Sequence, residues 1–409
     1  MPDRRILLAD ADAFFVAVAR MADPEGAGRS PLLIVGGRPG GRGVVCSASY
    51  ETRAFGVRSA MPIAQALRLC PDAMCVPVPR GACSATSKAI AAVLGRFTPV
   101  VEGASIDEWY LDLTGTEMLY SDESFEATAV RIRATVHRET GMWLSLGGGT
   151  SKLIAKLAAD RAKPRAGTGA TGVRIIPPGS EGDFMATLAL AEIPGIGPKL
   201  QAKLATLGLA RVEDVLPHDR ATLTRWLGRR PAEWLWARAR GIHTAPVESR
   251  GAARQISRES TFARDVADDV QLGAHLRALG AKAASELRSD RLSARTVTVK
   301  LRDADFTTRL ASRTLPEGLE SDSAIGDVAI GLLKKLRSAR RHPARLVGVA
   351  LGGLGPARDA EQLGLFAGAP ASQVERAEDR ALARAVDRVR ERFGDTAIRA
   401  ASTPAPRNP

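Results

Sequence analysis

Four carboxylates near the start of the chain have the types and spacing that could hold divalent cations. Asp10 and Asp12 stand one residue apart in LLADADAFF, at the end of an apolar run, and Asp107 and Glu108 are adjacent in SIDEWYLDL. Carboxylate oxygens suit Mg²⁺, and a pair of such ions can clamp the attacking and leaving oxygens of a phosphoryl transfer. A lone Asp-x-Asp usually caps a helix or solvates a turn, so the first pair is informative only if the second lies near it.

The predicted elements alternate strands and helices over the first 164 residues. The strands are short apolar or β-branched runs, predicted at 5–9, as a hairpin within 98–115, and at 142–149. The helices are predicted at 84–97, 123–139 and 150–163, the last opened by a Thr or Ser cap. This β-α-β-β-α-β order is ferredoxin-like.

In that order the first strand lies beside the hairpin, which brings Asp10 close to Asp107 and Glu108. Adjacent residues of a strand point to opposite faces, so Asp107 and Glu108 can share one site only at a turn or a bulge. Three close carboxylates repel one another unless cations neutralise them. The sequence therefore predicts a two-metal site, with Asp12 beside it in a structural role.

The rest of the chain predicts a helical segment and a second α+β region. The Pro- and Gly-rich stretch at 164–180 indicates a domain edge, and TAPVESRGAARQ is linker-like. Between them, EIPGIGPKLQAKL is typical of a helix-hairpin-helix, in which Gly195 and Gly197 form a tight turn before a helix that starts at Pro198. Free N–H groups there can bind a DNA phosphate without reading sequence; the alternative is an ordinary glycine turn.

Composition is consistent with a nucleic-acid partner. The 409 residues include 58 Lys or Arg and 45 Asp or Glu, a formal net charge of +13, which suits a polyanion or a solvated surface. Residues 254–345 alone hold 18 basic against 12 acidic residues. Four cysteines without metal-ligand spacing indicate buried reduced thiols, and no apolar run is long enough to span a membrane, so we expect a soluble cytoplasmic protein.

Six motifs stand in the order found in one enzyme family. They are DADAFF, RGVVCSASYETRAFGVRSAMP, SIDEWYLDLTG, GGGTSKLIAKLAADRAKP, IPGIGPKLQAKL and RTVTVKLRDADFTTRLASRTL. Over about residues 5–355 the chain resembles Y-family DNA polymerases of the bacterial DNA polymerase IV type. The resemblance implies a template-directed, low-fidelity translesion polymerase that adds deoxynucleotides to a primer 3′-end and lacks proofreading. Its rivals are a non-catalytic family relative that serves as a scaffold in DNA damage tolerance, and a helix-hairpin-helix DNA-binding or nuclease protein.

The resemblance also implies an α+β multidomain fold, a right-hand polymerase with a ferredoxin-like palm, small fingers, a helical thumb with the helix-hairpin-helix, and an α+β little finger. The implied ranges are 1–16 and 78–166 for the palm, 17–77 for the fingers, 167–242 for the thumb, 243–254 for a linker, 255–355 for the little finger and 356–409 for a tail.

Site residues follow from the matched motifs. Two Mg²⁺ ions would be held by Asp10, Asp107, Glu108 and the carbonyl of Ala11, with Glu108 as the catalytic carboxylate. Phe15 takes the steric-gate position under the sugar, although such a ring is otherwise a core aromatic. The remaining implied contacts to the nucleotide are Phe14, Ser47, Tyr50, Arg53 and Lys156, and those to DNA are Gly195, Gly197 and Lys199. An isolated Tyr-x-x-Arg would be an ordinary pair on a helix surface.

Four residues depart from the family pattern without removing a metal ligand: Ala19, Cys83, Trp109 and Ser151. Trp109 either packs under the sheet or narrows the site.

The tail carries one further motif. QLGLF resembles the peptide by which bacterial polymerases bind the β subunit sliding clamp, through Gln362, Leu363, Leu365 and Phe366; otherwise these residues fold back onto their own domain. A helix is predicted after it, with Leu382, Val386, Val389 and Phe393 on one face. The implied partners are thus primer-template DNA, deoxynucleoside triphosphates and the clamp, bound by a monomer without membrane contact.

Overall fold

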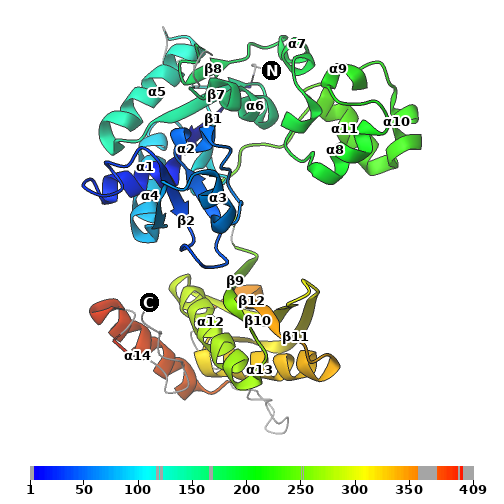
Figure 1. Cartoon of the computed structure of the whole chain (residues 1–409). Helices are drawn as coiled ribbons and strands as arrows, with labels where there is room; N and C mark the ends of the chain where they lie inside the picture. Colours follow the sequence, from blue (N-terminus) through cyan, green and yellow to red (C-terminus); the bar gives the residue numbers. More distant parts are fainter. Residues whose placement is uncertain are drawn as a thin grey trace, which may run out of the picture. The chain divides into compact units, whose positions relative to one another are not determined.

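The structure is a computed structural model that describes residues 4–116, 119, 123–164, 169–249, 251, 253–357, 375–394 and 397–398. The chain forms two compact units, Met1–Gly251 and Ala252–Pro409 (Figure 1). The predicted clamp-binding residues 362–366 lie outside the described residues. No helix among the described residues is both long and apolar enough to cross a bilayer.

A five-stranded sheet organises the first unit, and its middle strand is buried along its whole length. The strands run in the order β5 (Val101–Gly103), β6 (Glu108–Asp112), β1 (Ile6–Ala11), β7 (Leu144–Gly149) and β8 (Val173–Ile175). β1 is antiparallel to both neighbours, so the predicted ferredoxin-like core is confirmed. β8, in the range predicted for the thumb, pairs parallel with β7 and extends this sheet.

Side-chain alternation along β1 assigns each face of this sheet to different helices. Leu7, Ala9 and Ala11 pack with α4 (Arg80–Leu94) and α5 (Phe125–Thr140). Ile6 and Leu8 face α6 (Lys152–Ala162) instead (Figure 1). Successive residues of a strand point to opposite faces, so Asp10 is on the α6 side.

A close approach holds α6 against the sheet. A Cβ atom on Gly147 of β7 would lie 2.0 Å from the Ala159 nitrogen and 2.1 Å from the Ala155 carbonyl oxygen. Only glycine fits at that point, and its missing side chain lets the helix backbone lie directly over the strand.

The segment between β1 and α4 forms a smaller sheet with helices around it. Its strands run in the order β3 (Val45–Ala48), β2 (Leu33–Gly36) and β4 (Met74–Pro77). Its helices are α1 (Phe14–Ala22), α2 (Tyr50–Ala54) and α3 (Ile63–Leu69). Ser49 caps α2 by accepting a hydrogen bond from the Thr52 N–H.

Short helices make up the rest of the first unit. They are α7 (Glu181–Ala186), the 3₁₀ turn η2 (Leu190–Glu192), α8 (Pro198–Ala205), α9 (Val212–Val215), α10 (Arg220–Leu227) and α11 (Arg229–Ala239). Their core includes Leu153 and Leu157 of α6. Part of the expected linker packs on the main sheet, because Val247 is buried beside Ile6 and Leu8.

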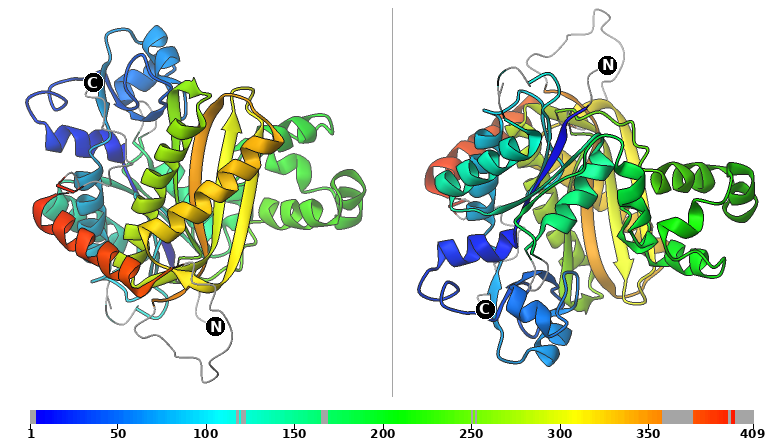
Figure 2. Two further views of the ribbon diagram at one scale, coloured as in Figure 1. Left: turned by 90° about the horizontal axis from the view of Figure 1, so that it is seen from below. Right: turned by 90° about the horizontal axis from the view of Figure 1, so that it is seen from above.

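The second unit is a four-stranded sheet covered on one face by two helices (Figure 2). The strands run in the order β11 (Thr308–Leu319), β10 (Leu292–Asp303), β12 (Ala344–Pro356) and β9 (Gln255–Val266). The helices are α12 (Asp269–Ser289) and α13 (Asp322–Ala339). Hydroxyl pairs link β10 to β11, with 2.9 Å between Thr296 and Thr314 and 2.8 Å between Thr298 and Ser312.

The predicted tail helix is present as α14 (Ala377–Phe393), but its apolar stripe is only partly buried. Leu382 and Phe393 are 67% and 66% exposed. The helix is held by ion pairs instead: buried Arg288 of α12 donates to both carboxylate oxygens of Asp387, at 2.6 and 2.9 Å.

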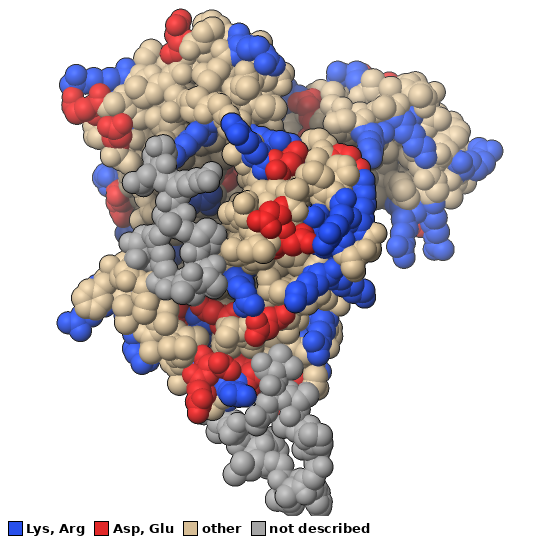
Figure 3. All heavy atoms as spheres, turned by 60° about the horizontal axis from the view of Figure 1, so that its bottom comes forward, with Lys and Arg blue, Asp and Glu red and all other residues tan. Residues whose placement is uncertain are grey.

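The excess of basic residues is uneven over the visible face in Figure 3. Lys and Arg prevail over Asp and Glu on the lobe that α8 to α11 form, whereas the two signs are interspersed elsewhere. Exposed basic residues of that lobe are Lys199, Lys203, Arg211, Arg220, Arg225, Arg229 and Arg230.

Candidate active site

Two carboxylates, Asp10 and Glu108, face each other at one end of β1, and a third, Asp107, comes directly before Glu108. The antiparallel register places Asp10 directly opposite Glu108, and directly opposed side chains point to the same face. Asp107 is the last residue of the turn before β6, where its carbonyl accepts a hydrogen bond of 2.9 Å from the Ala11 N–H. Because Asp107 precedes β6, strand alternation does not fix the direction of its side chain.

Two lysines from α6 and its C-terminal cap neutralise this group. Lys156 Nζ lies 2.6 Å from Glu108 Oε1, and Lys163 Nζ lies 2.8 Å from Asp10 Oδ2. Seven residues, about two helical turns, separate the lysines, so both reach the same side of the helix. Asp107 instead accepts a hydrogen bond from the Ser105 hydroxyl.

Sequence reasoning identified Lys156 but missed Lys163 and Ser105. Each stands inside a quoted motif, Lys163 just before the proline of DRAKP and Ser105 two residues before Asp107. Their signal was proximity in sequence to carboxylates already selected, but only the folded chain shows which oxygen each one contacts.

Burial makes the central carboxylate hard to ionise. Asp10 is 7% exposed, and loss of solvation raises its pKa to about 7 against the opposing charge of Lys163. The Glu108 charge adds to the increase. Although burial alone would lower it, the pKa of Lys163 is raised, because Asp10 and Asp160 both stabilise the ammonium.

The donor set suits a hard divalent cation, but the carboxylates are paired with lysines in this arrangement. Across the described residues, no three His, Cys, Asp or Glu side chains converge closely enough to form a metal-binding group. Asp10 and Glu108 nevertheless supply opposed carboxylate oxygens, each paired with a lysine on a long flexible stem. Such oxygens are the ligands that Mg²⁺ prefers.

The two phenylalanines after Asp12 differ in environment. Phe14 is buried in the core under the sheet, so its ring is closed to a ligand and only its backbone is available. Phe15 is partly buried, and its ring packs edge-on against Phe14 with 5.4 Å between centroids. Asp12 accepts a hydrogen bond of 2.7 Å from Ser145, in keeping with a structural role.

Ser47, Tyr50 and Arg53 come together on β3 and α2. Arg53 Nε donates to the Ala48 carbonyl at 2.9 Å, its Nη2 lies 3.5 Å from the Ser47 hydroxyl, and its guanidinium lies 4.9 Å from the centre of the Tyr50 ring. This arrangement aligns a guanidinium, a phenol and a hydroxyl, which are donors that suit phosphate oxygens.

The departures from the family pattern do not enter the carboxylate site. Trp109 is buried on the α4 and α5 face beside Ala9, which settles that it packs under the sheet. Cys83 and Ala19 are also core residues. Ser151 caps α6, where its hydroxyl accepts from the Ile154 N–H. All four cysteines are free, but Cys46 is exposed, so the expectation that all are buried is wrong for it.

The glycine turn has the backbone that sequence reasoning expected. Gly195 has a φ of +101°, and a Cβ there would lie 2.8 Å from the Trp234 ring. Gly197 is the N-cap of α8 with no side-chain hydrogen bond, Pro198 is the first helical residue, and Lys199 is exposed. The start of α8 thus presents backbone amides beside a cation.

Comparisons with known proteins point in one direction. Residues 9–160 match the family described as impB/mucB/samB, residues 253–365 match its C-terminal domain, and residues 178–209 match its HHH motif. The chain is 38% identical to the DNA polymerase IV of Halorhodospira halophila over 360 residues, 88% of this chain and 98% of that one. It is 35% identical to the DNA polymerase IV of Desulfatibacillum aliphaticivorans over 402 residues, 98% of this chain and 97% of that one.

Solved structures agree with these matches. A Y-family DNA polymerase chimera of Dbh and Dpo4 superposes with a TM-score of 0.75 at 26% identity, over 85% of this chain and 98% of that one. An insertion ternary complex of Dbh DNA polymerase gives a TM-score of 0.60 at 28% identity, over the same shares.

The raised pKa of Asp10 predicts how pH affects the stability of the metal-free protein. Protonated Asp10 favours the folded state fully below its unfolded pKa of 3.8, and this contribution is lost as pH rises through about 7. In EDTA, the difference in free energy of unfolding between Asp10→Asn and wild type should therefore shift in favour of the variant by about 1–3 kcal/mol when the pH is raised from 5 to 8. The size follows because one pKa unit corresponds to ~1.4 kcal/mol. Thermal unfolding of both proteins at pH 5 and at pH 8 measures this shift, with Asp72→Asn at an exposed position as the control. The same stability difference between Asp10→Asn and wild type at both pH values would contradict the prediction.

Proposed function

This chain belongs to the Y-family DNA polymerases of the DNA polymerase IV type, and on that basis we propose that it is a template-directed translesion DNA polymerase. It adds deoxynucleotides to a primer 3′-end with low fidelity and without proofreading. The observation that carries the proposal is the β1–β6 register, which sets Asp10 directly opposite Glu108. A scaffold would not need these carboxylates, so the non-catalytic alternative has no support.

In the proposed reaction Asp10, Asp107, Glu108 and the Ala11 carbonyl hold two Mg²⁺ ions. When bound, the ions supply positive charge at the attacking 3′-oxygen and at the leaving pyrophosphate. The lysines now paired with these carboxylates have flexible stems. Lys156 and Lys163 would turn from the carboxylates to the phosphates once the carboxylate charge is neutralised.

Ser47, Tyr50 and Arg53 bind the incoming nucleotide from the side opposite the carboxylates. Their donors face the triphosphate, and the planar guanidinium of Arg53 suits two parallel hydrogen bonds to phosphate oxygens. The start of α1, where Ala13 is the N-cap and makes no side-chain hydrogen bond, adds backbone amides that favour an anion. Phe15, partly buried directly after this cap, would lie under the sugar and exclude a 2′-hydroxyl.

Primer-template DNA is bound without reading its sequence. The amides before α8, together with Lys199, would hold a phosphate of the backbone. In the second unit, the face of β10 and β11 opposite the helices presents the hydroxyl pairs described above. Small hydroxyl side chains on a flat sheet suit contact with the DNA backbone.

The proposal also covers a protein partner, the oligomeric state and the location in the cell. QLGLF would tether the polymerase to the sliding clamp, with Gln362 at the pocket rim and Leu363, Leu365 and Phe366 as apolar anchors. We take the protein to act as a monomer in the cytoplasm, where its free thiols would stay reduced.

The first test concerns the carboxylates. Glu108→Gln or Asp107→Asn should lower the rate of primer extension by more than about 100-fold, because charge at the transferring phosphoryl group is no longer neutralised. Binding of primer-template, measured by fluorescence anisotropy, should change less than about threefold. Glu102→Gln is the matched control, since Glu102 pairs with Lys152 of the same helix at 2.6 Å but lies outside the site. Equal losses of binding and activity would argue against these roles.

The second test concerns sugar selection. Phe15→Ala should lower the ratio of kcat/KM for a deoxynucleotide over the matching ribonucleotide by at least about tenfold, because the space under the sugar opens. Phe15→Tyr keeps the ring and should preserve most of the ratio. If Phe15→Ala leaves the ratio unchanged, Phe15 is only a core residue.

The third test concerns the clamp. Joint replacement of Gln362, Leu365 and Phe366 by Ala should leave clamp-free extension within about twofold but remove stimulation by a loaded clamp. Processivity assays with and without the clamp measure both effects. Undiminished stimulation, or a markedly lower Tm of the triple variant, would favour a segment that folds back on its own domain.

A further inference from the structure

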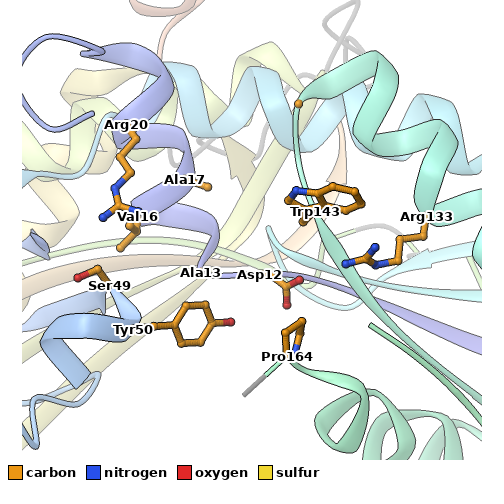
Figure 4. A pocket seen from close by; sticks show the side chains of 11 residues that line it. Asp12, Ala13, Val16, Ala17, Arg20, Ser49, Tyr50, Arg133, Trp143 and Pro164 are labelled. Carbon is orange, nitrogen blue, oxygen red and sulfur yellow. The ribbon is translucent and has the colours of Figure 1, made fainter. Parts of the chain in front are cut away.

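An aromatic side chain that the proposed reaction does not use stands exposed on the turn between β10 and β11. This residue, Phe306, is 62% exposed, so burial in a core does not account for it. The cavity of about 380 Å³ beside Tyr50, which Ala13, Ala17 and Trp143 also line, adjoins the proposed triphosphate site and is counted with it (Figure 4). The turn in the second unit therefore needs an explanation of its own.

The backbone of Phe306 lies in the left-handed region, where a bulky side chain is strained. Its φ is +66°, and the other described non-glycine residues with a positive φ are two alanines and an arginine. Such a conformation persists only where the surrounding structure enforces it, and it is common at functional sites. Glycine would take this φ without strain, so the turn does not need a phenylalanine in order to form.

Buried Asp303 holds the turn in this conformation. Its carboxylate accepts hydrogen bonds from Arg309, at 2.9 and 3.1 Å, and from Arg340, at 3.1 Å. Arg340 also donates to Asp305 of the turn at 2.7 Å. The Phe306 N–H donates to the Asp303 carbonyl at 2.9 Å. The ring is therefore presented on a rigid support, which reduces the entropy lost when a ligand binds.

The Phe306 ring is backed by a cation but is not covered by it. The Arg345 guanidinium lies 4.5 Å from the ring centre. Since the side chain is still 62% exposed, this contact leaves room for a second planar group on the ring. Aromatic side chains combined with arginines are the groups that hold bases of single-stranded nucleic acids.

Charge around the turn favours a polyanion over an acidic or apolar partner. The segments that form and flank it, 300–313 and 340–345, hold seven basic and two acidic residues. Both acidic residues, Asp303 and Asp305, are paired with arginines. The net charge left on this part of the sheet is therefore positive, which suits phosphates next to the ring.

A row of cross-strand pairs leads from the proposed DNA-binding face to the turn. The hydroxyl pairs of β10 and β11 are followed on the same face by Arg302 opposite Thr308, because residues two apart in a strand share a face. Arg302 Nε donates to the Thr308 hydroxyl at 2.9 Å. Phe306 comes two residues before Thr308, so a DNA strand whose phosphates follow this row would reach the ring.

We propose that Phe306 stacks on an unpaired base of single-stranded DNA held against the second unit. The inference rests on the proposed function and names a partner for it, the single-stranded overhang of the template. Bases inside a duplex already stack on both sides, so only an unpaired base or a duplex end offers an open face. In a primer-template, the template overhang supplies such bases.

The test measures binding of the full chain to a labelled primer-template with a thymine overhang by fluorescence anisotropy. Phe306→Gly should raise Kd by about fivefold or more, the lower range for stacking of one base on an aromatic side chain. Its Tm should stay within about 3 °C of wild type, because glycine takes the positive φ without strain. Phe306→Trp keeps a ring and should bind within about threefold of wild type.

An abasic overhang separates base stacking from other losses. Replacing the overhang thymines by abasic residues should raise Kd for wild type and have a clearly smaller effect on Phe306→Gly. The slope of log Kd against log salt concentration should be the same for both proteins, because no phosphate contact is lost. Equal Kd values of wild type and Phe306→Gly on the thymine overhang would overturn the proposal, as would the same loss of affinity by both on the abasic one.

Phe393→Gly is the matched control. Phe393 is 66% exposed and has the Arg392 guanidinium 5.3 Å from its ring centre, but it lies on α14. This variant should leave Kd unchanged, and a rise equal to that of Phe306→Gly would overturn the proposal. If Phe306→Gly melts at a markedly lower temperature, Phe306→Asn takes its place, since Asn also tolerates a positive φ. Failure of wild type to extend a primer would overturn the proposed function, whereas the binding results would still decide the role of Phe306.

Discussion

The rest of the first unit depends on the burial of carboxylate charge at the end of a central strand. Asp10 follows four apolar residues of β1 and has lost most of its contact with water, so its ionised form is costly without positive charge nearby. Lys163 provides that charge to Asp10 and Lys156 provides it to Glu108. The same arrangement that weakens the folded state prepares oxygen ligands for cations, which is a common compromise at active sites.

The need for positive charge beside the buried carboxylate explains features that lie away from it. The lysines reach the site only because α6 lies directly on the sheet, and Gly147 permits that contact. Val247 extends the apolar cluster under Ile6 and Leu8, so part of the segment expected as a plain linker shields the same face. Ser151 caps α6 and so fixes where the helix begins. From that start, Lys156 and Lys163 are placed about two turns apart, where they reach Glu108 and Asp10.

Charge has a different role in the second unit. There, α14 is bound through Arg288 and Asp387 while Leu382 and Phe393 stay exposed. A buried, doubly hydrogen-bonded guanidinium can hold a helix of polar composition, although such pairs contribute less net stability than an apolar contact of the same size. Periodicity alone predicts the helix correctly, but it cannot predict the ion pairs that hold the helix, because their partners from α12 are distant in sequence.

Local sequence determined the elements, the acidic residues and the family. The apolar run of β1, the Ser151 cap and the adjacent Asp107 and Glu108 are short-range features, and they predicted the ferredoxin-like sheet and the meeting of the two acidic motifs. Tertiary structure alone decided which lysine contacts which carboxylate, that Trp109 packs under the sheet, and that Phe14 is closed to ligands while Phe15 is not. It also decided that Ala13, Ala17 and Trp143 enclose a cavity. These outcomes depend on how closely helices approach the sheet and on which face each side chain takes, and both are set by contacts between residues far apart in the chain.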